Sequence, residues 1–501
     1  MEELCVFNGV DGTTGGYLLP PARPGSLPVW GAGRDDHAHQ AELRWRHHQK
    51  TESTFAPIEG IDPTRLDEAG WGLVLPVNAD PAIVKALDPL LQHRRRQAGA
   101  IDERRFRVFT VLPGESKSAF LSRHGAGPGA ADPTIVPYYL LLAGDPVSIP
   151  FRFQYQLDVA YAVGRIAFEQ AKEFAVYAES VVRAETTPPR QRGSVAFFAP
   201  RNPNDAATAL SLDHLVTPLV AAVSDMGPHI QVQTVVGEAA TADGLRRVLT
   251  QPPALLFTAS HGLGLPFGHQ RQRVLQGALV CQEWPGPNGP RFDEAWCFSG
   301  DDVDPSGDLT SLITFHFACF GAGTPQWDDY FRKPGAMGTE LAGKEIAPAP
   351  FVAALPNRLL VNPGGGALAS VGHIDRAWGY SFAWPNVGRQ TAVYESTLRR
   401  LISGHPLGSA LEYFNQRYAE LASDLLAELE EVAGGMDADD VALAAMWTAR
   451  NDARGFTIVG DPAVRLAGAP GELRPAVESL RGRPRRRGPG DVPGEDRCAA
   501  R

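Results

Sequence analysis

Residues 312–325 read LITFHFACFGAGTP, an apolar and β-branched run that stops at Cys319 and continues into Gly321 and Gly323. Such a run is typical of a buried strand. It places a single thiol at the end of the strand, and the glycines allow the chain to turn away. A second stretch, residues 254–262 (ALLFTASHG), has the same form and ends at His261 and Gly262. These two strand ends are where we expect the functional site.

Strand and helix patterns alternate along most of the chain. Strands are expected at 70–77, 105–112 and 138–146, a long helix at 167–185, and a closing strand within 455–466. Residues 149–166 have no clear period, and we interpret them as an irregular aromatic segment. Alternating strands and helices predict βαβ units and therefore an α/β fold with a mostly parallel sheet.

Composition along the chain suggests four regions. Residues 1–60 are expected to form an irregular N-terminal arm, 61–166 a smaller N-terminal α/β subdomain, and 167–466 the main domain. Residues 467–501, which are rich in proline, glycine and arginine, predict a disordered basic tail.

Overall charge and the cysteines exclude several classes of protein. The net charge of −10 gives no general reason to expect nucleic-acid binding. The N-terminus lacks the features of a signal peptide, and no apolar run approaches the roughly 20 residues of a membrane helix. The five cysteines are odd in number and scattered, which argues against a disulfide framework. We therefore expect a cytoplasmic protein with reduced thiols and no membrane partner.

Metal and cofactor sites are not expected. His261, His269 and Cys281 do not match a standard zinc spacing. The glycine-rich stretch 363–372 (PGGGALASVG) lacks the order of a nucleotide-binding loop. We predict neither a metal nor a cofactor.

Cys319 and His261 together predict nucleophilic chemistry. Ligands of parallel α/β sheets bind beyond the carboxyl ends of the strands, and a crossover could bring these two strands side by side. A thiolate could then attack a carbonyl carbon while the imidazole transfers the proton. The backbone N–H groups of Gly262 and Cys319 could form an oxyanion hole. A lone cysteine more often only packs, so the prediction depends on the pair.

The motifs TASHG (258–262) and HFACFGAGTP (316–325) resemble the His-Gly and Ala-Cys-x-Gly motifs of caspase-like cysteine proteases. This group contains caspases, gingipains, separases and bacterial CHAT-type proteins. Segments 140–166, 365–372 and 455–466 resemble further parts of gingipain-type peptidases, so the resemblance covers roughly residues 70–466. It implies a three-layer αβα caspase-like fold, with 167–466 as the catalytic domain.

The resemblance also implies roles for the residues of the motifs. His261 would be the general base and acid, Cys319 the nucleophile, and Gly262 and Cys319 the oxyanion donors. The chain would be a cysteine endopeptidase acting on a protein or peptide, with bacterial defence or programmed cell death as its setting. Because it lacks an obvious pro-segment, we expect its activity to be restrained until an activating protein partner or self-cleavage releases it.

Substrate specificity is not inherited from the motif. Several relatives carry Asp or Gln two positions before the cysteine, where this chain has Phe317. Phe317 and three residues after the next strand, His373, Asp375 and Trp378, are candidate substrate-binding residues. Asp375 could bind a basic side chain of the substrate, or it could cap or pair with the neighbourhood of Arg376 on the surface.

Two other functions remain open at this stage. A scaffold could keep the fold while the dyad is too far apart to react. Another acyl-transfer enzyme, such as a transpeptidase or an amidase, could use the same dyad. Asp213 and His214 form a further pair, which is more typical of a helix face than of a site.

Overall fold

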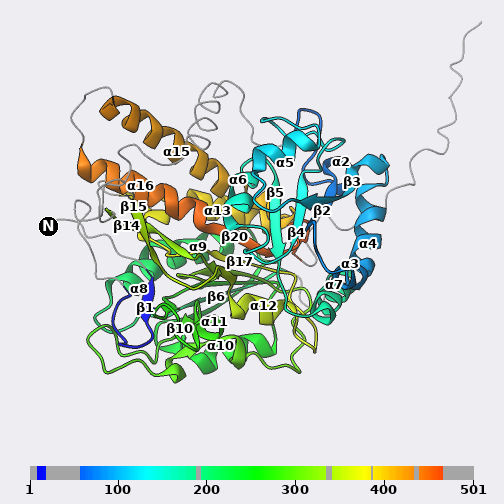
Figure 1. The fold of residues 1–501 in the computed structure, drawn as a ribbon. Helices are drawn as coiled ribbons and strands as arrows, with labels where there is room; N and C mark the ends of the chain where they lie inside the picture. The colour runs from blue at the N-terminus through cyan, green and yellow to red at the C-terminus, as the bar shows by residue number, and fades with distance from the viewer. Residues whose placement is uncertain are drawn as a thin grey trace, which may run out of the picture.

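A ten-stranded sheet forms the centre of the protein (Figure 1). The computed structural model describes residues 8–18, 57–187, 193–334, 341–384, 387–433 and 439–466. The order across the sheet is β3-β2-β4-β5-β20-β17-β12-β8-β6-β7. In chain order the strands are β2 (Trp71–Pro76), β3 (Phe106–Val111), β4 (Tyr139–Ala143), β5 (Ala162–Ile166), β6 (Ser194–Ala199), β7 (Gln231–Val236), β8 (Leu255–Ala259), β12 (Ile313–Phe317), β17 (Ala369–His373) and β20 (Phe456–Gly460).

The sheet consists of two parallel blocks that run in opposite directions. Strands β3, β2, β4, β5 and β20 are parallel to one another, and so are β17, β12, β8, β6 and β7. The blocks meet at β17 and β20, which pair antiparallel. The predicted α/β fold with a mostly parallel sheet is confirmed. Because the blocks are opposed, the carboxyl ends of β8 and β12 do not share a sheet edge with those of β2–β5.

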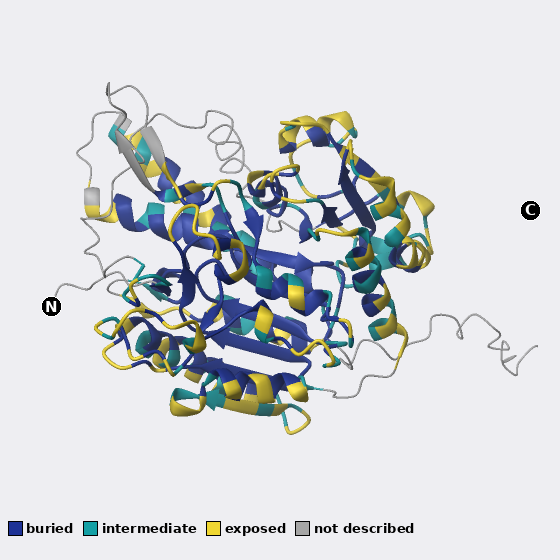
Figure 2. Cartoon of the chain, turned by 60° about the horizontal axis from the view of Figure 1, so that its bottom comes forward, coloured by how far each residue is buried: buried dark blue, intermediate teal, exposed yellow. Residues whose placement is uncertain are grey.

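Helices cover both faces of the sheet (Figure 1). Contacts join α3, α4 and α7 in one group and α9, α13, α15 and α16 in another. Strands such as β4, β8 and β12 are buried along their whole length, as expected for a parallel sheet covered on both faces, and exposed residues gather on the outer helix faces (Figure 2). The helices are α2 (Leu66–Ala69), α3 (Pro81–Ala86), α4 (Asp88–Ala98), α5 (Lys117–Arg123), α6 (Phe151–Leu157), α7 (Ala171–Thr186), α8 (Ala206–Leu210), α9 (Thr217–Ser224), α10 (Ala242–Thr250), α11 (Gln272–Leu275), α12 (Ala354–Leu360), α13 (Ala392–Ile402), α14 (Leu407–Ala410), α15 (Glu412–Ala433) and α16 (Asp440–Gly455).

The segment 149–166 is regular, contrary to the prediction. It contains α6 and β5, and β5 pairs with both β4 and β20. The apolar and aromatic residues of this segment follow no single helix or strand period, because a short helix is followed by a short strand. Arg165 stabilises the connection from inside, because its guanidinium donates to Gln154 and to the backbone carbonyls of Gly144 and Ile149.

One helical stretch of the described residues, Ala206–Ser224, is long and apolar enough to cross a membrane by length and composition alone. No run of this kind was expected from the sequence. Core helices of soluble proteins meet the same criteria, so the feature is weak evidence for a membrane span. In this fold Leu215, Val216 and Leu219 pack into the main hydrophobic core.

A second, four-stranded sheet lies beside the carboxyl ends of β8 and β12. It contains β1 (Gly9–Asp11), β9 (Gly262–Gly264), β10 (Leu279–Val280) and β11 (Cys297–Phe298). Strand β1 comes from the predicted irregular arm, yet it pairs in parallel with β9, with Gly9 opposite Gly262. Figure 1 shows β1 in dark blue beside β10 and α8, well away from the rest of the N-terminal part. The predicted basic tail, 467–501, lies outside the described residues.

Candidate active site

Neighbouring strands deliver His261 and Cys319 to the same edge of the sheet. Strands β8 and β12 are parallel, with Ala259 opposite Phe317. His261 lies two residues after Ala259, and Cys319 lies two residues after Phe317. The two residues are therefore at the same level, just beyond the carboxyl ends of the strands. Both side chains are fully buried. The structure therefore brings together the two residues predicted as a dyad.

The imidazole of His261 is oriented by a carboxylate that the sequence analysis did not identify. Nε2 of His261 lies 2.9 Å from Oδ2 of Asp205. An ionised carboxylate can only accept hydrogen bonds, so Nε2 carries a proton. Nδ1 is buried and has no hydrogen-bond partner among the described residues. It is the ring atom available for proton transfer.

Asp205 is held ionised by its own partners. It is the N-cap of α8, and its carboxylate also accepts from the hydroxyls of Thr208 (2.5 Å) and Tyr17 (2.6 Å). Burial alone would raise the pKa of this carboxyl, but the charge and hydrogen bond of His261, together with the two hydroxyls, hold the pKa below its ordinary range. The only local signal for Asp205 is its N-cap position after β6, a position that is usually structural.

The thiol of Cys319 is turned toward the loop after β17. Its Sγ accepts a hydrogen bond from the backbone N–H of Ala377 at 3.3 Å. Among the described residues, the thiol and the imidazole of His261 do not hydrogen-bond each other. Burial raises the pKa of the Cys319 thiol well above its ordinary value, so the thiol is protonated in this arrangement.

Two strained backbone positions hold the loop against Cys319. Phe320 and Asp375 both have positive φ angles, of 58° and 94°. The N–H of Phe320 donates to the carbonyl oxygen of Asp375 at 2.6 Å. Residues other than glycine adopt these backbone conformations at a cost of about 1–3 kcal/mol, and such positions cluster at functional sites.

The backbone N–H groups of Gly262 and Cys319 converge on one oxygen atom. Both donate to the backbone carbonyl of Asn8, at 2.8 Å and 3.0 Å. These are the two donors expected to form an oxyanion hole. Position 262 requires glycine, because a Cβ there would lie 1.8 Å from the carbonyl oxygen of Cys319. The protein's own backbone, and not only a substrate, excludes a side chain there.

Phe317 and Trp378, two of the candidate substrate-binding residues, are buried by aromatic neighbours. The ring of Phe317 packs edge-on against Phe382, with ring centroids 5.3 Å apart. The indole of Trp378 lies 5.5 Å from the ring of Tyr330, and its backbone N–H donates to Asp452. Both residues lie within the core of the described structure, and their role in binding substrate stays a prediction.

His373 and Asp375 both lie beside ionisable side chains inside the protein. Nε2 of His373 is 3.2 Å from Oδ1 of Asp452. Asp375 is 3.2 Å from the guanidinium of Arg376, which also forms two contacts of 2.8–2.9 Å with Asp328. Of the two readings of Asp375, the structure shows the pairing with Arg376, although both residues are buried and not on the surface. Burial raises the pKa of Asp375 to about 8.

Other features named from the sequence lie away from this site. Asp213 is half-exposed and pairs with Arg201 at 2.7 Å, as expected for a helix face.

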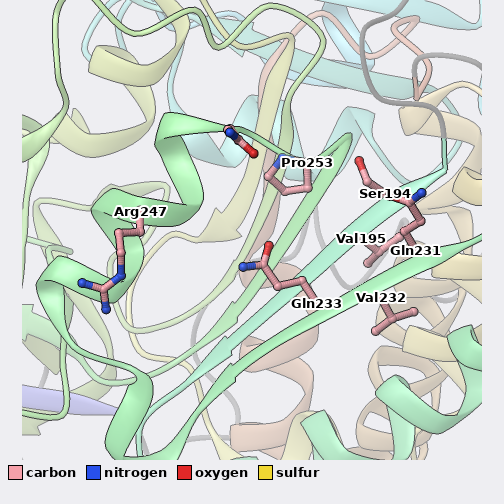
Figure 3. A pocket seen from close by; sticks show the side chains of 8 residues that line it. Ser194, Val195, Gln231, Val232, Gln233, Arg247 and Pro253 are labelled. Carbon is pink, nitrogen blue, oxygen red and sulfur yellow. The ribbon is translucent and has the colours of Figure 1, made fainter.

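A hollow of about 380 Å³ is lined by Ser194, Gln231, Gln233, Arg247 and Gln251 (Figure 3). It lies at the amino ends of β6 and β7, at the sheet edge opposite to Cys319, and is therefore separate from the candidate site.

Comparisons with known proteins give structural neighbours only. No protein-family model matches the chain, and no curated protein matches it in sequence. A solved structure described as a protease is 12% identical, with a TM-score of 0.43 over 79% of this chain and 78% of its own. Gingipain R (RgpB), an Arg-specific cysteine proteinase, is 11% identical, with a TM-score of 0.43 over 82% and 80%. A complex of the pro- and mature domains of RgpB from Porphyromonas gingivalis is 11% identical, with a TM-score of 0.40 over 79% of each chain.

Proposed function

We propose that the protein is a cysteine endopeptidase with Cys319 as the nucleophile and His261 as the general base and acid. The observation that carries this proposal is the convergence of the Gly262 and Cys319 N–H groups on one carbonyl oxygen. Two such donors stabilise the oxyanion that forms when a thiolate attacks a peptide carbonyl. The adjacent imidazole, oriented by Asp205, supports the same assignment.

In the proposed reaction, Sγ of Cys319 attacks the carbonyl carbon of the substrate and its proton passes to Nδ1 of His261. The imidazolium returns this proton to the leaving amine as the peptide bond breaks. Water then hydrolyses the thioester, releases a carboxylate and restores the thiol. Asp205 stabilises the imidazolium and keeps the ring in the tautomer that leaves Nδ1 free.

A non-catalytic scaffold is the second candidate, and the surroundings of the Cys319 thiol favour it. The Cys319 thiol hydrogen-bonds to Ala377, its pKa is raised, and it makes no hydrogen bond to His261 among the described residues. A catalytic thiol must be ionised when it attacks. The protease proposal therefore requires the surroundings of Cys319 to change when substrate binds.

We also propose, from the sequence resemblance, a cytoplasmic enzyme that cuts one dedicated protein partner, with bacterial defence or cell death as the setting. The three described cysteines, Cys281, Cys297 and Cys319, are free thiols, which agrees with a reducing compartment. An activating protein partner would fit the buried state of the dyad.

A peptide-library cleavage assay at neutral pH separates these functions. The protein, Cys319→Ala and His261→Ala are incubated with the library, and the products are identified by mass spectrometry. We expect cleavage by the unmodified protein only. Equal cleavage by Cys319→Ala would contradict the protease proposal, and transfer of the acyl group to an added amine in place of water would indicate a transpeptidase.

A further inference from the structure

The peptide that contains Asn8 occupies the candidate site in the manner of a substrate. Its carbonyl oxygen accepts from Gly262 and Cys319, and its N–H donates to the carbonyl of Ala377 at 3.0 Å. One residue of the chain is thus held by three backbone hydrogen bonds from the two strand ends and from the loop that contacts the thiol. Backbone contacts of this kind fix an extended peptide whatever its side chain.

The side chain of Asn8 is also bound specifically. Its amide nitrogen donates to Oγ of Ser211 at 3.0 Å and to the carbonyl oxygen of Ser260 at 3.1 Å. The carbonyl of Ser260 can only accept, so the Asn8 atom that faces it must be a donor. Ser211 begins a π-helical turn, 211–216, between α8 and α9, and turns of this kind are frequent at functional sites.

The residues after Asn8 continue past His261. Strand β1 runs parallel to β9, and Val10 packs in a small core with Leu263. Farther along, the hydroxyl of Tyr17 donates to Asp205 and the indole N–H of Trp284 donates to the carbonyl of Gly15. The segment is therefore anchored from Asn8 to Tyr17, whose ring centroid lies 5.7 Å from that of His261.

We propose that residues 8–11 occupy the position of a substrate, with the Asn8–Gly9 peptide bond at the place of the bond that is cleaved. The site accepts asparagine as the residue before that bond. This inference rests on the proposed function and adds its substrate class. The bound segment also blocks the oxyanion donors, so external peptides must displace it.

The carboxamide is selected because of the Ser260 carbonyl. An aspartate has almost the same shape, but its carboxylate cannot donate to that carbonyl and would repel it. Sites built to hydrogen-bond a polar group reject close analogues that lack the donor by large factors. Asn8→Asp should therefore release the segment with little change in size.

Two measurements on three variants test the proposal. Asn8→Asp and Ser211→Ala are the test variants, and Thr14→Ala, on the exposed turn of the same segment, is the control. The first is the alkylation rate of Cys319 by iodoacetamide, read by mass spectrometry. The second is kcat/KM for peptide coumarylamides that differ only in a last residue of Asn, Asp, Leu or Arg. Circular dichroism and melting temperature confirm folding, and Asn8→Ala replaces Asn8→Asp if the latter does not fold.

We expect alkylation of Asn8→Asp to be roughly tenfold faster than that of the unmodified protein or of Thr14→Ala, because the variant loses the hydrogen bond to Ser260 and gains repulsion from its carbonyl oxygen. The released protein should prefer Asn over Asp by at least roughly tenfold, and Ser211→Ala should reduce this preference. Unchanged alkylation in Asn8→Asp, or cleavage without a preference for Asn, would overturn the inference and leave the protease proposal standing. No cleavage by any variant would overturn both.

Discussion

At the scale of single residues, the properties of His261 depend on its partner Asp205. The carboxylate accepts from Nε2 and is itself held by the hydroxyls of Thr208 and Tyr17. In the proposed mechanism this contact sets which nitrogen is free and stabilises the imidazolium. Asp205 acts only through His261 and is therefore a positioning residue.

Replacing Asp205 by Asn should lower kcat/KM for peptide cleavage by roughly a hundredfold or more, because Asn can donate to Nε2 and favour the wrong tautomer. The pH profile of kcat/KM should also shift, which a purely structural role would not cause. Asp213→Asn, an exposed aspartate on the same helical stretch, is the control and should retain full activity. An unchanged rate and profile in Asp205→Asn would remove Asp205 from the mechanism.

The sequence predicted His261, Gly262 and Cys319 because each lies at the end of an apolar strand. It did not reveal Asp205 or Asn8. Asp205 looks like an ordinary helix N-cap, and Asn8 lies in a glycine-rich arm with no regular period. Their proximity to His261 depends on the packing of α8 and on the pairing of β1 with β9, which no local pattern records.

At the scale of elements, the close approach of β9 to the end of β12 requires glycine at position 262. In Gly262→Ala the new Cβ would overlap the carbonyl oxygen of Cys319. We expect a loss of roughly 3 kcal/mol or more in the free energy of unfolding, because backbone and not a flexible side chain must move. Gly127→Ala, where a Cβ meets nothing within 4 Å, is the control in the same urea titration. A difference below about 0.5 kcal/mol between the two variants would show that the strand ends are looser than described.

Asp158, between α6 and β5, should make stability depend on pH. Burial raises its pKa from 3.8 to about 7, although its carboxylate accepts from the N–H of Val163. The folded state therefore binds this proton more tightly than the unfolded state, and the stabilisation is present below pH 4 and lost as pH rises toward 7.

Asp158→Asn should remove that loss. We expect the variant to gain roughly 2–4 kcal/mol relative to the unmodified protein between pH 4 and pH 8, at about 1.4 kcal/mol per pKa unit. The measurement is the free energy of unfolding from urea titrations at several pH values. Asp424→Asn, at an exposed position, should show no such gain. Parallel pH curves for Asp158→Asn and the unmodified protein would contradict the burial argument.

The strands and helices with a clear period were predictable, and those decided by packing were not. Strands β2, β3, β8 and β12 lie where the apolar runs indicated. Helix α6 and strand β5 were missed because a short helix and a short strand follow each other, so that no single period runs through the segment. The reversal between β17 and β20 also has no local signature, since both strands are buried along their whole length.

At the scale of the whole molecule, a buried ionic network joins helices α4 and α7 to the segment that follows β20. Arg94 in α4 contacts Asp461, just after β20, at 2.7 Å and Glu185 in α7 at 2.6 Å. Asp461 also accepts from the indole N–H of Trp71 at 3.0 Å. The network connects the predicted N-terminal subdomain to the last segment of the predicted catalytic domain.

Arg94→Leu should lower the free energy of unfolding by roughly 3–5 kcal/mol, because it leaves two carboxylates without their buried cation. Arg96→Leu, on the exposed face of the same helix, is the matched control. Denaturation should be followed by circular dichroism and by tryptophan fluorescence. We expect the two probes to give one shared transition, and an undisturbed midpoint in Arg94→Leu would show that the network contributes little.

The position of β20 has a consequence for how the chain is made. Among the described residues this strand is the last in sequence, yet it lies fifth of ten in the sheet, between β5 and β17. Without residues 456–460 no strand would connect β5 to β17, and each half-sheet would have an unpaired inner edge that could pair with other chains. The two half-sheets can join only when β20 is available. A nascent or truncated protein would therefore expose unpaired strand edges to chaperones. The complete sheet that carries Cys319 would exist only after synthesis has passed residue 460.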